Sequence, residues 1–537
     1  MFKWIMPIIF FIFLSGCQVT PTGFPNHLYL SNKSHINTPY EPTTDKINQL
    51  IKHKKWHQAE NLLNSELASP TKNSSPPIYF KFKAQIAEQR RDILTALSSW
   101  LSYCKNQHEE NCPPAWRLIN QTPTHILTSI AKLPSAQPIR NWLELGPLIQ
   151  TGDLDGLEKW KQHHNNLPAW IKIHETNFKK KPQSIAVLLS PKGPMEEENK
   201  AIKQGLLAAY YQTKQPNNIK LNFYNIDPKN FQQSIQSSLQ NKPDLIIGLT
   251  TPDEVKKALD IIPINTPVIA LAPHEEKRNN LYTLNLNQEI ELKQLSRALQ
   301  DHHLNKTIIL HYDDAKSQQL GQNFSDILSL SSRSPVTITE LSKGKEPEII
   351  RNLMGINNSE NRARQIQSKL NIKNNKMKFL PTRRNDFDSI FLALSRRQAR
   401  KIVPLLRYYF IDPSNIYSTS TLLNGISNHF KNTDLNEIHL LAPNWMADKI
   451  NLNPYNANLF HTISKLKDTH FQQYKIHYAL GIDAFNLSQH LPILEQFPHS
   501  QLTGATGHLY LLNNGHIWRE LSLLRYRNGL TQQEITP

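Results

Sequence analysis

The amino-acid sequence predicts a mixed fold, in which an all-α domain precedes a two-lobed α/β domain. The first observation is helical periodicity without strand signals across residues 44–178. The second is an alternation of short apolar runs with helical segments across residues 184–530. The third is length, because 537 residues exceed what one compact core usually holds. We therefore expect a domain boundary at the basic stretch that follows Phe178.

The α/β domain opens with a strand, loop and helix unit. Ile185–Leu189 is a short β-branched and leucine-rich run, and Ser190–Pro194 interrupts it with two prolines and a glycine. Apolar side chains then recur at three- and four-residue spacing from Ile202 to Tyr210, which predicts one face of an amphipathic helix. Three glutamates, Glu196–Glu198, fall in its first turn, where the helix dipole favours negative charge.

Nine further strand candidates follow at regular intervals, and helical segments separate most of them. This alternation indicates parallel sheets with helices on both faces, and ten strands suit two lobes better than one sheet. The end of the chain differs, because His508–Leu512 and His516–Leu521 flank an Asn-Gly pair and predict a β-hairpin. The nine candidates are Ile219–Tyr224, Leu245–Leu249, Val268–Leu271, Leu281–Leu286, Thr307–His311, Val336–Leu341, Ser389–Leu394, Asn415–Ser418 and Glu437–Leu441.

The helical domain begins with two short amphipathic segments. Residues 47–51 carry one apolar stripe, and after a basic turn Trp56, Ala59, Leu63 and Leu67 form the next. This spacing resembles a tetratricopeptide-type helical hairpin, in which large and small residues interlock. An ordinary helical bundle is the alternative, because the repeat has no strict period.

The N-terminus predicts export. Residues 1–16 carry Lys3 and then an apolar run that is shorter than the ~20 residues a membrane span needs, which is typical of a signal peptide. The run ends in Leu-Ser-Gly-Cys, which resembles a bacterial lipobox and predicts lipidation of Cys17, although an ordinary signal peptide with an incidental cysteine is the alternative. Gln18 rather than aspartate follows, which favours the outer membrane, and residues 17–43 are expected to form a flexible tether.

Two other cysteines remain, Cys104 and Cys112. In an oxidising compartment they could close a short loop as a disulfide, and two free thiols are the alternative. His108 alone does not complete a zinc site, so no metal is expected.

The chain is basic, with 61 Lys+Arg against 44 Asp+Glu and a formal net charge of +17. Such a balance raises the question of a nucleic-acid partner. The export signal argues against one. Arg383, Arg384, Arg396 and Arg397 are instead a candidate patch for an acidic partner or an anionic wall polymer, and solvated loops and helix faces are the alternative.

No motif for nucleophilic, metal-dependent or nucleotide chemistry is present, so we expect a non-enzymatic protein without a cofactor. In doubly wound lobes small molecules bind at the carboxyl ends of strands. Hydroxyl groups there could hold a carboxylate, or they could simply cap the following helices. The candidate crevice residues are Ser190, Lys192, Thr250, Thr251, Asp313, Ser418 and Thr419.

Several stretches of the α/β domain resemble the LppC/LpoA lipoprotein family. The resemblance is specific in this domain, whereas in the helical domain it concerns the layout alone. Two lobes in an exported lipoprotein also suggest the periplasmic-binding-protein type I fold. The stretches are Leu188–Pro194 with the helix after it, Leu353–Ile356, Arg383–Leu392, Ala479–Ala484, Leu502–Gly507 and Arg525–Gly529.

The resemblance implies a function that no single residue reveals. Members of the family are outer-membrane lipoproteins on the periplasmic side that activate a class A penicillin-binding protein through the C-terminal domain. The resemblance thus implies that the partner is a bifunctional peptidoglycan synthase, and peptidoglycan is a further candidate partner. Two alternatives remain open: a lipid-anchored solute receptor of the amino-acid-binding type, and a passive envelope scaffold.

Overall fold

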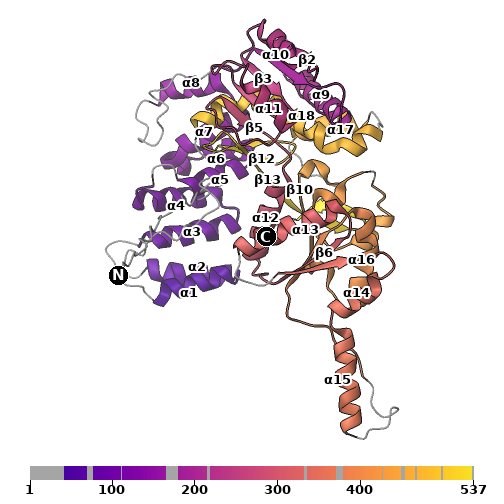
Figure 1. Ribbon diagram of the computed structural model, residues 1–537. Coiled ribbons are helices and arrows are strands. Elements are labelled where there is room, and N and C mark those ends of the chain that lie inside the picture. The colour runs from indigo at the N-terminus through magenta and orange to yellow at the C-terminus, as the bar shows by residue number, and fades with distance from the viewer. Residues whose placement is uncertain are drawn as a thin grey trace, which may run out of the picture.

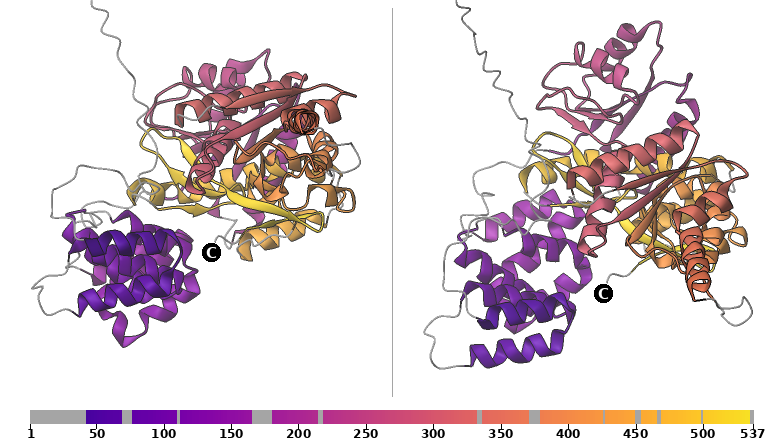
Figure 2. Two further views of the ribbon diagram at one scale, coloured as in Figure 1. Left: turned by 90° about the horizontal axis from the view of Figure 1, so that it is seen from below. Right: turned by 60° about the horizontal axis from the view of Figure 1, so that its bottom comes forward.

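The computed structural model describes residues 42–68, 76–109, 112–164, 180–213, 218–331, 336–370, 379–425, 427–448, 454–465, 469–497 and 500–534. Within these residues a stack of helices is followed by a two-lobed α/β head (Figure 1). Figure 2 shows the stack beside the head from two further directions.

The stack consists of eight α-helices in the described residues and is tetratricopeptide-like. Helix α4 begins after Asp92, whose carboxylate accepts a hydrogen bond from the backbone N–H of Thr95 at 3.1 Å. Helix α8 begins in the same way after Asp153. The helices are α1 (Pro42–Lys52), α2 (Trp56–Leu67), α3 (Pro77–Gln89), α4 (Ile93–Asn106), α5 (Pro113–Gln121), α6 (Thr124–Ala131), α7 (Arg140–Thr151) and α8 (Leu154–His163), with a 3₁₀ segment η2 (Pro134–Ile139).

The predicted stripes form the core of the first helices. Ile47, Ala59 and Leu63 are buried where α1, α2 and α3 meet, whereas Leu67 at the end of the second stripe is exposed. Farther along the stack, Cys104 and Cys112 are bonded as a disulfide, with their Cα atoms 5.5 Å apart. Both cysteines are buried in the main core of the stack.

The first lobe is a five-stranded parallel sheet in the order β2-β1-β3-β4-β5. Apolar clusters lie on both faces, so β1, β3, β4 and β5 are buried nearly throughout, as predicted for parallel strands, whereas the edge strand β2 is only half-buried. The elements are β1 (Ser184–Leu189), α9 (Glu196–Gln212), β2 (Lys220–Asn225), α10 (Phe231–Leu239), β3 (Leu245–Gly248), α11 (Pro252–Leu259), β4 (Val268–Ala270) and β5 (Leu281–Thr283).

The second lobe repeats this strand order as β7-β6-β8-β9-β10. An interaction at the start of the first strand recurs too. Asp244 accepts hydrogen bonds from the N–H groups of Gln183 and Ser184 where β1 begins, and Asp388 accepts two from Asn305 and Lys306 just before β6. The elements are α12 (Gln288–Asp301), β6 (Thr307–Tyr312), α13 (Ala315–Ser331), β7 (Thr337–Leu341), α14 (Glu346–Leu353), α15 (Ile356–Lys369), β8 (Ser389–Ala393), α16 (Arg396–Tyr408), η5 (Pro413–Asn415), β9 (Ile416–Thr419), η6 (Ser420–Leu423), η7 (Lys431–Leu435) and β10 (His439–Ala442).

The C-terminal hundred residues join the lobes and depart from a purely parallel plan. After β10 the chain returns to the first lobe through η8 (Asn444–Met446), α17 (Pro454–Ser464) and α18 (Thr469–Gln496). The predicted hairpin is present as β12 (His508–Leu511) and β13 (Ile517–Glu520), beside β11 (Leu502–Thr503). The expectation of wholly parallel lobe sheets was wrong, because β14 (Ser522–Arg527) and β15 (Leu530–Gln533) add to the second lobe antiparallel to β10 and to each other.

Helix α18 crosses α9 at two glycines. A side chain on Gly205 would overlap the carbonyl oxygen of Tyr478, and one on Gly481 would overlap that of Ile202. Because the missing side chains let the two backbones touch, the crossing is far closer than larger residues would allow. It lies in the largest core cluster of the first lobe.

The C-terminal end of α18 enters the helical stack. Ile493 and Phe497 are buried in the core that α4, α5 and α7 form. His490 is half-buried, and its ring lies against Gly152 at the end of α7. The side-chain amide of Gln501 donates to the backbone carbonyl of Asn120, on α5, at 3.1 Å. The stack and the head therefore share a packed interface.

We predict that Gly481→Ala lowers the free energy of unfolding by about 1–3 kcal/mol, because its new methyl group meets backbone that cannot move independently. Gly321→Ala on α13 is the matched control. There the nearest atoms are side-chain carbons of Ile309 and His311 at 3.3 and 3.5 Å rather than backbone at 2.0 Å, and the helix propensity of alanine offsets the smaller strain. Chemical denaturation of both variants tests this, and equal midpoints would contradict the tight crossing.

His490 predicts a pH dependence at the interface. Burial, and secondarily Lys181, lowers its pKa to about 4, against a hydrogen bond with the Gln150 backbone. A folded pKa below the unfolded value of 6.5 means that stability is lost as pH falls from about 6.5 to about 4. We expect this loss to be about 3 kcal/mol and to be absent in His490→Gln. Denaturation midpoints of both proteins across this range measure it, and parallel pH profiles would contradict the assignment.

Candidate functional site

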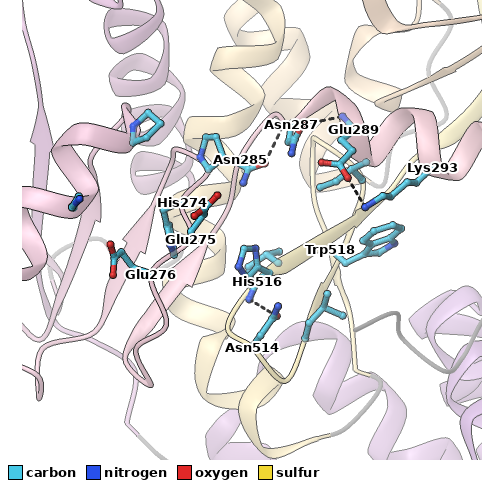
Figure 3. A pocket seen from close by; sticks show the side chains of 16 residues that line it. His274, Glu275, Glu276, Asn285, Asn287, Glu289, Lys293, Asn514, His516 and Trp518 are labelled. Carbon is cyan, nitrogen blue, oxygen red and sulfur yellow. Dashed lines mark hydrogen bonds and ion pairs between the residues drawn. The ribbon is translucent and has the colours of Figure 1, made fainter. Parts of the chain in front are cut away.

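A pocket of about 780 Å³ lies where the first lobe meets α12 and the hairpin β12–β13 (Figure 3). Its walls come from the loops after β4 and β5, the first turns of α12 and the hairpin tip. The carboxyl ends of parallel strands are the usual binding edge of such sheets. The residues labelled in Figure 3 are His274, Glu275, Glu276, Asn285, Asn287, Glu289, Lys293, Asn514, His516 and Trp518.

Two histidines face each other across this pocket. The ring centroids of His274 and His516 are 5.7 Å apart. The Nε2 atom of His274 also makes a hydrogen bond with the Thr283 hydroxyl at 2.5 Å. Partial burial lowers the pKa of both imidazoles, and the neighbouring His516 lowers that of His274 further. Both rings are therefore neutral near pH 7 and offer one donor and one acceptor each.

The start of α12 forms the opposite wall. Asn287 caps the helix by accepting a hydrogen bond from the N–H of Glu289 at 2.9 Å, and Glu289 pairs with Lys293 at 2.5 Å. The wall therefore presents amides and a neutralised ion pair. The described lining contains no serine, threonine or cysteine that could act as a nucleophile.

None of the seven predicted crevice residues lines this pocket. Glu254 engages three of them. Its carboxylate accepts hydrogen bonds from the Ser190 hydroxyl at 2.8 Å and from the Thr250 N–H at 2.8 Å, and Thr251 forms a capping box with it at the start of α11. The capping interpretation therefore describes these hydroxyls better than a ligand site.

The remaining four crevice candidates fall at three places: Ser418 and Thr419 at the end of β9, Lys192 after β1 and Asp313 after β6. The Ser418 hydroxyl is buried and donates to the Leu392 carbonyl at 2.7 Å, and the Thr419 hydroxyl bonds that of Thr421. Lys192 and Asp313 are exposed, each in the loop after the first strand of its lobe. The structure therefore does not bring the seven residues together as one binding site.

A buried charge cluster that the sequence interpretation missed lies where the lobes join. Glu291 on α12 and Asp483 on α18 are fully buried, and the buried Arg519 of β13 interacts electrostatically with both. Burial raises the pKa of both carboxyls, and Arg519 opposes this. None of the guanidinium nitrogens of Arg519 has a hydrogen bond to the described residues, so it acts as a buried charge. The Ser420 hydroxyl also donates to the Glu291 carboxylate and lies 2.8 Å from both of its oxygens.

Asp483 holds the loop that precedes the hairpin. Its carboxylate accepts hydrogen bonds from the Ala505 N–H at 2.6 Å, the Thr506 N–H at 2.7 Å and the Thr506 hydroxyl at 2.6 Å. A side chain on Gly504 would overlap this carboxylate. Burial nevertheless raises the pKa of Asp483 to about 6. The sequence offered one indication of this contact: residues 479–484 and 502–507 both resemble the family, and they contain the polar residues Asp483 and Thr506.

The structure separates the four arginines of the candidate patch. Arg396 is buried and donates to the carbonyls of Leu422 and Gly425, so it supports a loop. Arg384 pairs with Asp386 at 2.5 Å, and Arg383 lies over the Phe387 ring at 5.6 Å. Arg397 is exposed. Only part of the predicted patch is therefore free to meet a partner.

Three further expectations concern the N-terminus and metals. Cys17 and the tether up to residue 41 lie outside the described residues. Within those residues no helix is both long and apolar enough to cross a bilayer. The same residues contain no group of three or more His, Cys, Asp or Glu side chains that could hold a metal ion.

The fold defines a class of protein: a tetratricopeptide-like stack joined to a head of periplasmic-binding-protein type I architecture. The chain belongs to the family described as "LppC putative lipoprotein", which matches residues 47–529. That match spans both the stack and the head.

Two relatives and one solved structure carry the name LpoA. "Penicillin-binding protein activator LpoA" of Vibrio antiquarius is 23% identical over 76% of this chain and 70% of its own. Its namesake in Photobacterium profundum is 20% identical over 89% of this chain and 80% of its own. The crystal structure of LpoA from Haemophilus influenzae in its second monoclinic form covers 92% of this chain and 87% of its own, with a TM-score of 0.51 and 16% identity, which shows a shared fold.

We predict that Arg519→Met lowers the free energy of unfolding by about 3–5 kcal/mol, because it leaves two buried carboxylates without their cation. Adding Glu291→Gln should recover part of that loss, since it removes one uncompensated charge while keeping an acceptor for Ser420. Denaturation midpoints of the single and double variants measure the coupling. Strictly additive effects would show that the two side chains do not interact.

Proposed function

We propose that this protein is an outer-membrane lipoprotein that stimulates peptidoglycan synthesis by binding a class A penicillin-binding protein through its α/β head. The observation that carries the proposal is family membership across both domains, together with relatives named as activators of a penicillin-binding protein. Activation of this kind requires a protein surface rather than a catalytic constellation.

The N-terminal sequence supports the anchored arrangement. A lipidated Cys17 followed by Gln18 would place the chain at the periplasmic side of the outer membrane, and the residues before α1 would link the anchor to the helical stack. Along the chain the stack comes before the head, and in space it lies beside the head (Figure 1).

The head itself favours protein contact over solute transport. The hydroxyl groups at the predicted crevice are engaged by Glu254 and by backbone carbonyls. In addition, Glu291 and Arg519 fix α12, η6 and β13 to one another at the lobe junction. A receptor that closes around a ligand would have to disturb this buried cluster.

The proposal predicts that the unlipidated protein, residues 18–537, accelerates glycan polymerisation and crosslinking by a purified class A synthase. We expect a rate increase of about five-fold or more, the size of an ordinary coupling free energy. Labelled lipid-linked precursor and gel or chromatographic analysis of the products measure both reactions. Absence of both stimulation and binding would overturn the proposal.

The same preparation separates the alternatives. A thermal-shift series with amino acids and muropeptides should leave the melting temperature unchanged, whereas a concentration-dependent rise would favour a solute receptor. Co-sedimentation with purified sacculi tests peptidoglycan as a further partner.

A further inference from the structure

Helix α15 extends from the second lobe as an arm (Figures 1 and 2). Its first turns are held firmly. The Ser359 hydroxyl accepts a hydrogen bond from the Thr382 N–H at 3.0 Å, and the Arg384 N–H donates to the Met354 carbonyl at 2.9 Å. The returning chain therefore fixes the base of the arm, and its direction from the lobe is defined by packing.

One stripe runs along the whole arm. Ile356, Ser359, Ala363, Ile366 and Leu370 follow the three- and four-residue spacing of a single helix face. The first three are buried against the lobe. The last two continue the same face beyond it and are 48% and 61% exposed. Among the described residues, the apolar stripe therefore extends beyond the part of the lobe that covers it.

The returning segment adds to this apolar surface. Leu380 is 82% exposed and Phe379 is 37% exposed. They come just before Thr382, which lies beside Ser359. Exposed apolar side chains that gather on one projecting element are a usual mark of an interaction site.

The charge on the arm has one sign. Residues 361–370 contain Arg362, Arg364 and Lys369 and no acidic residue, and all three cations are exposed. Glu360, nearer the base, is paired with Arg351 at 2.6 Å. A partner that complements this surface carries an apolar floor with an acidic rim.

We propose that residues 361–370, which are the outer part of α15 and its C-cap, together with Leu380 of the returning segment, dock in an acidic-rimmed apolar groove of the class A synthase, as an amphipathic helix enters a groove. This inference rests on the proposed function and names the surface that performs it. An anionic membrane is the less suitable occupant, because an interfacial helix needs a broad apolar face, whereas this stripe is two residues long where it is exposed.

The first test replaces the exposed stripe. Ile366→Asp/Leu370→Asp should weaken binding to the purified synthase about ten-fold or more and reduce stimulation in parallel, because both side chains lose their apolar contact. Leu330→Asp is the matched control, since Leu330 is 90% exposed on α13. Circular dichroism and the melting temperature should not change in either variant, because neither site is buried.

The second test addresses charge. Arg362→Glu should weaken binding and flatten its dependence on salt, whereas Lys316→Glu, an equal charge change at an exposed site on α13, should do neither. Vesicles of anionic phospholipid serve as a parallel probe for all four variants.

The outcomes separate the two proposals. If the unaltered protein stimulates the synthase and both arm variants do so equally well, the docking inference falls and the proposed function stands. If the unaltered protein neither binds nor stimulates, both fall. If the arm variants lose binding to vesicles but still bind and stimulate the synthase, the arm contacts a membrane and the inference is overturned.

Discussion

The structure depends on one helix that three parts of the protein share. Helix α18 touches α9 backbone to backbone through Gly205 and Gly481, which fixes it in the core of the first lobe. Its Asp483 then holds the loop before the hairpin, and its last turn places Ile493 in the core of the helical stack. Because a helix is stiff along its axis, these contacts set the position of the hairpin and of the stack relative to the first lobe. A contact between two glycines fixes the distance between the helices closely, because backbone meets backbone and no side chain can change its rotamer to alter that distance.

The lobe junction follows from this arrangement. Asp483 positions the hairpin, and the hairpin places Arg519 near the buried carboxylate of Glu291 on α12. Gln294, also on α12, donates to the backbone carbonyl of Arg519 and accepts from the backbone N–H of Leu521. Solute receptors of this architecture open and close about their lobe junction, so polar groups that fix it favour a head with one shape. A head of fixed shape suits a protein that acts by presenting a surface. The pocket beside His274 and His516 lies at this junction and does not coincide with the hydroxyl-rich loops of the strand ends.

The arm formed by α15 differs from the rest of the head in having an apolar stripe that no described element covers along its outer half. Lobes of this kind normally bury such stripes against their sheets, as α9 and α16 do. Within the described residues, Arg362, Arg364 and Lys369 form no ion pair, unlike Arg384 with Asp386 and Arg525 with Glu437. Stability therefore does not account for this surface, whereas recognition of another protein does.

The sequence by itself determined whatever is local. Side-chain periodicity placed the ten parallel strands, the helical stack and the Asn-Gly hairpin, because a helix face or a strand run is written within ten to twenty residues. Tertiary structure alone decided which polar residues meet. Ser190 and Thr250 bond Glu254, Arg396 turns inward to the Leu422 carbonyl, and Arg519 lies between carboxylates that are 36 and 228 residues away along the chain. The antiparallel addition of β14 to β10 was equally beyond reach, because it joins strands some 80 residues apart. Whether a charged or hydroxyl side chain is exposed, capped or buried depends on partners brought close only by folding, and no local pattern encodes that proximity.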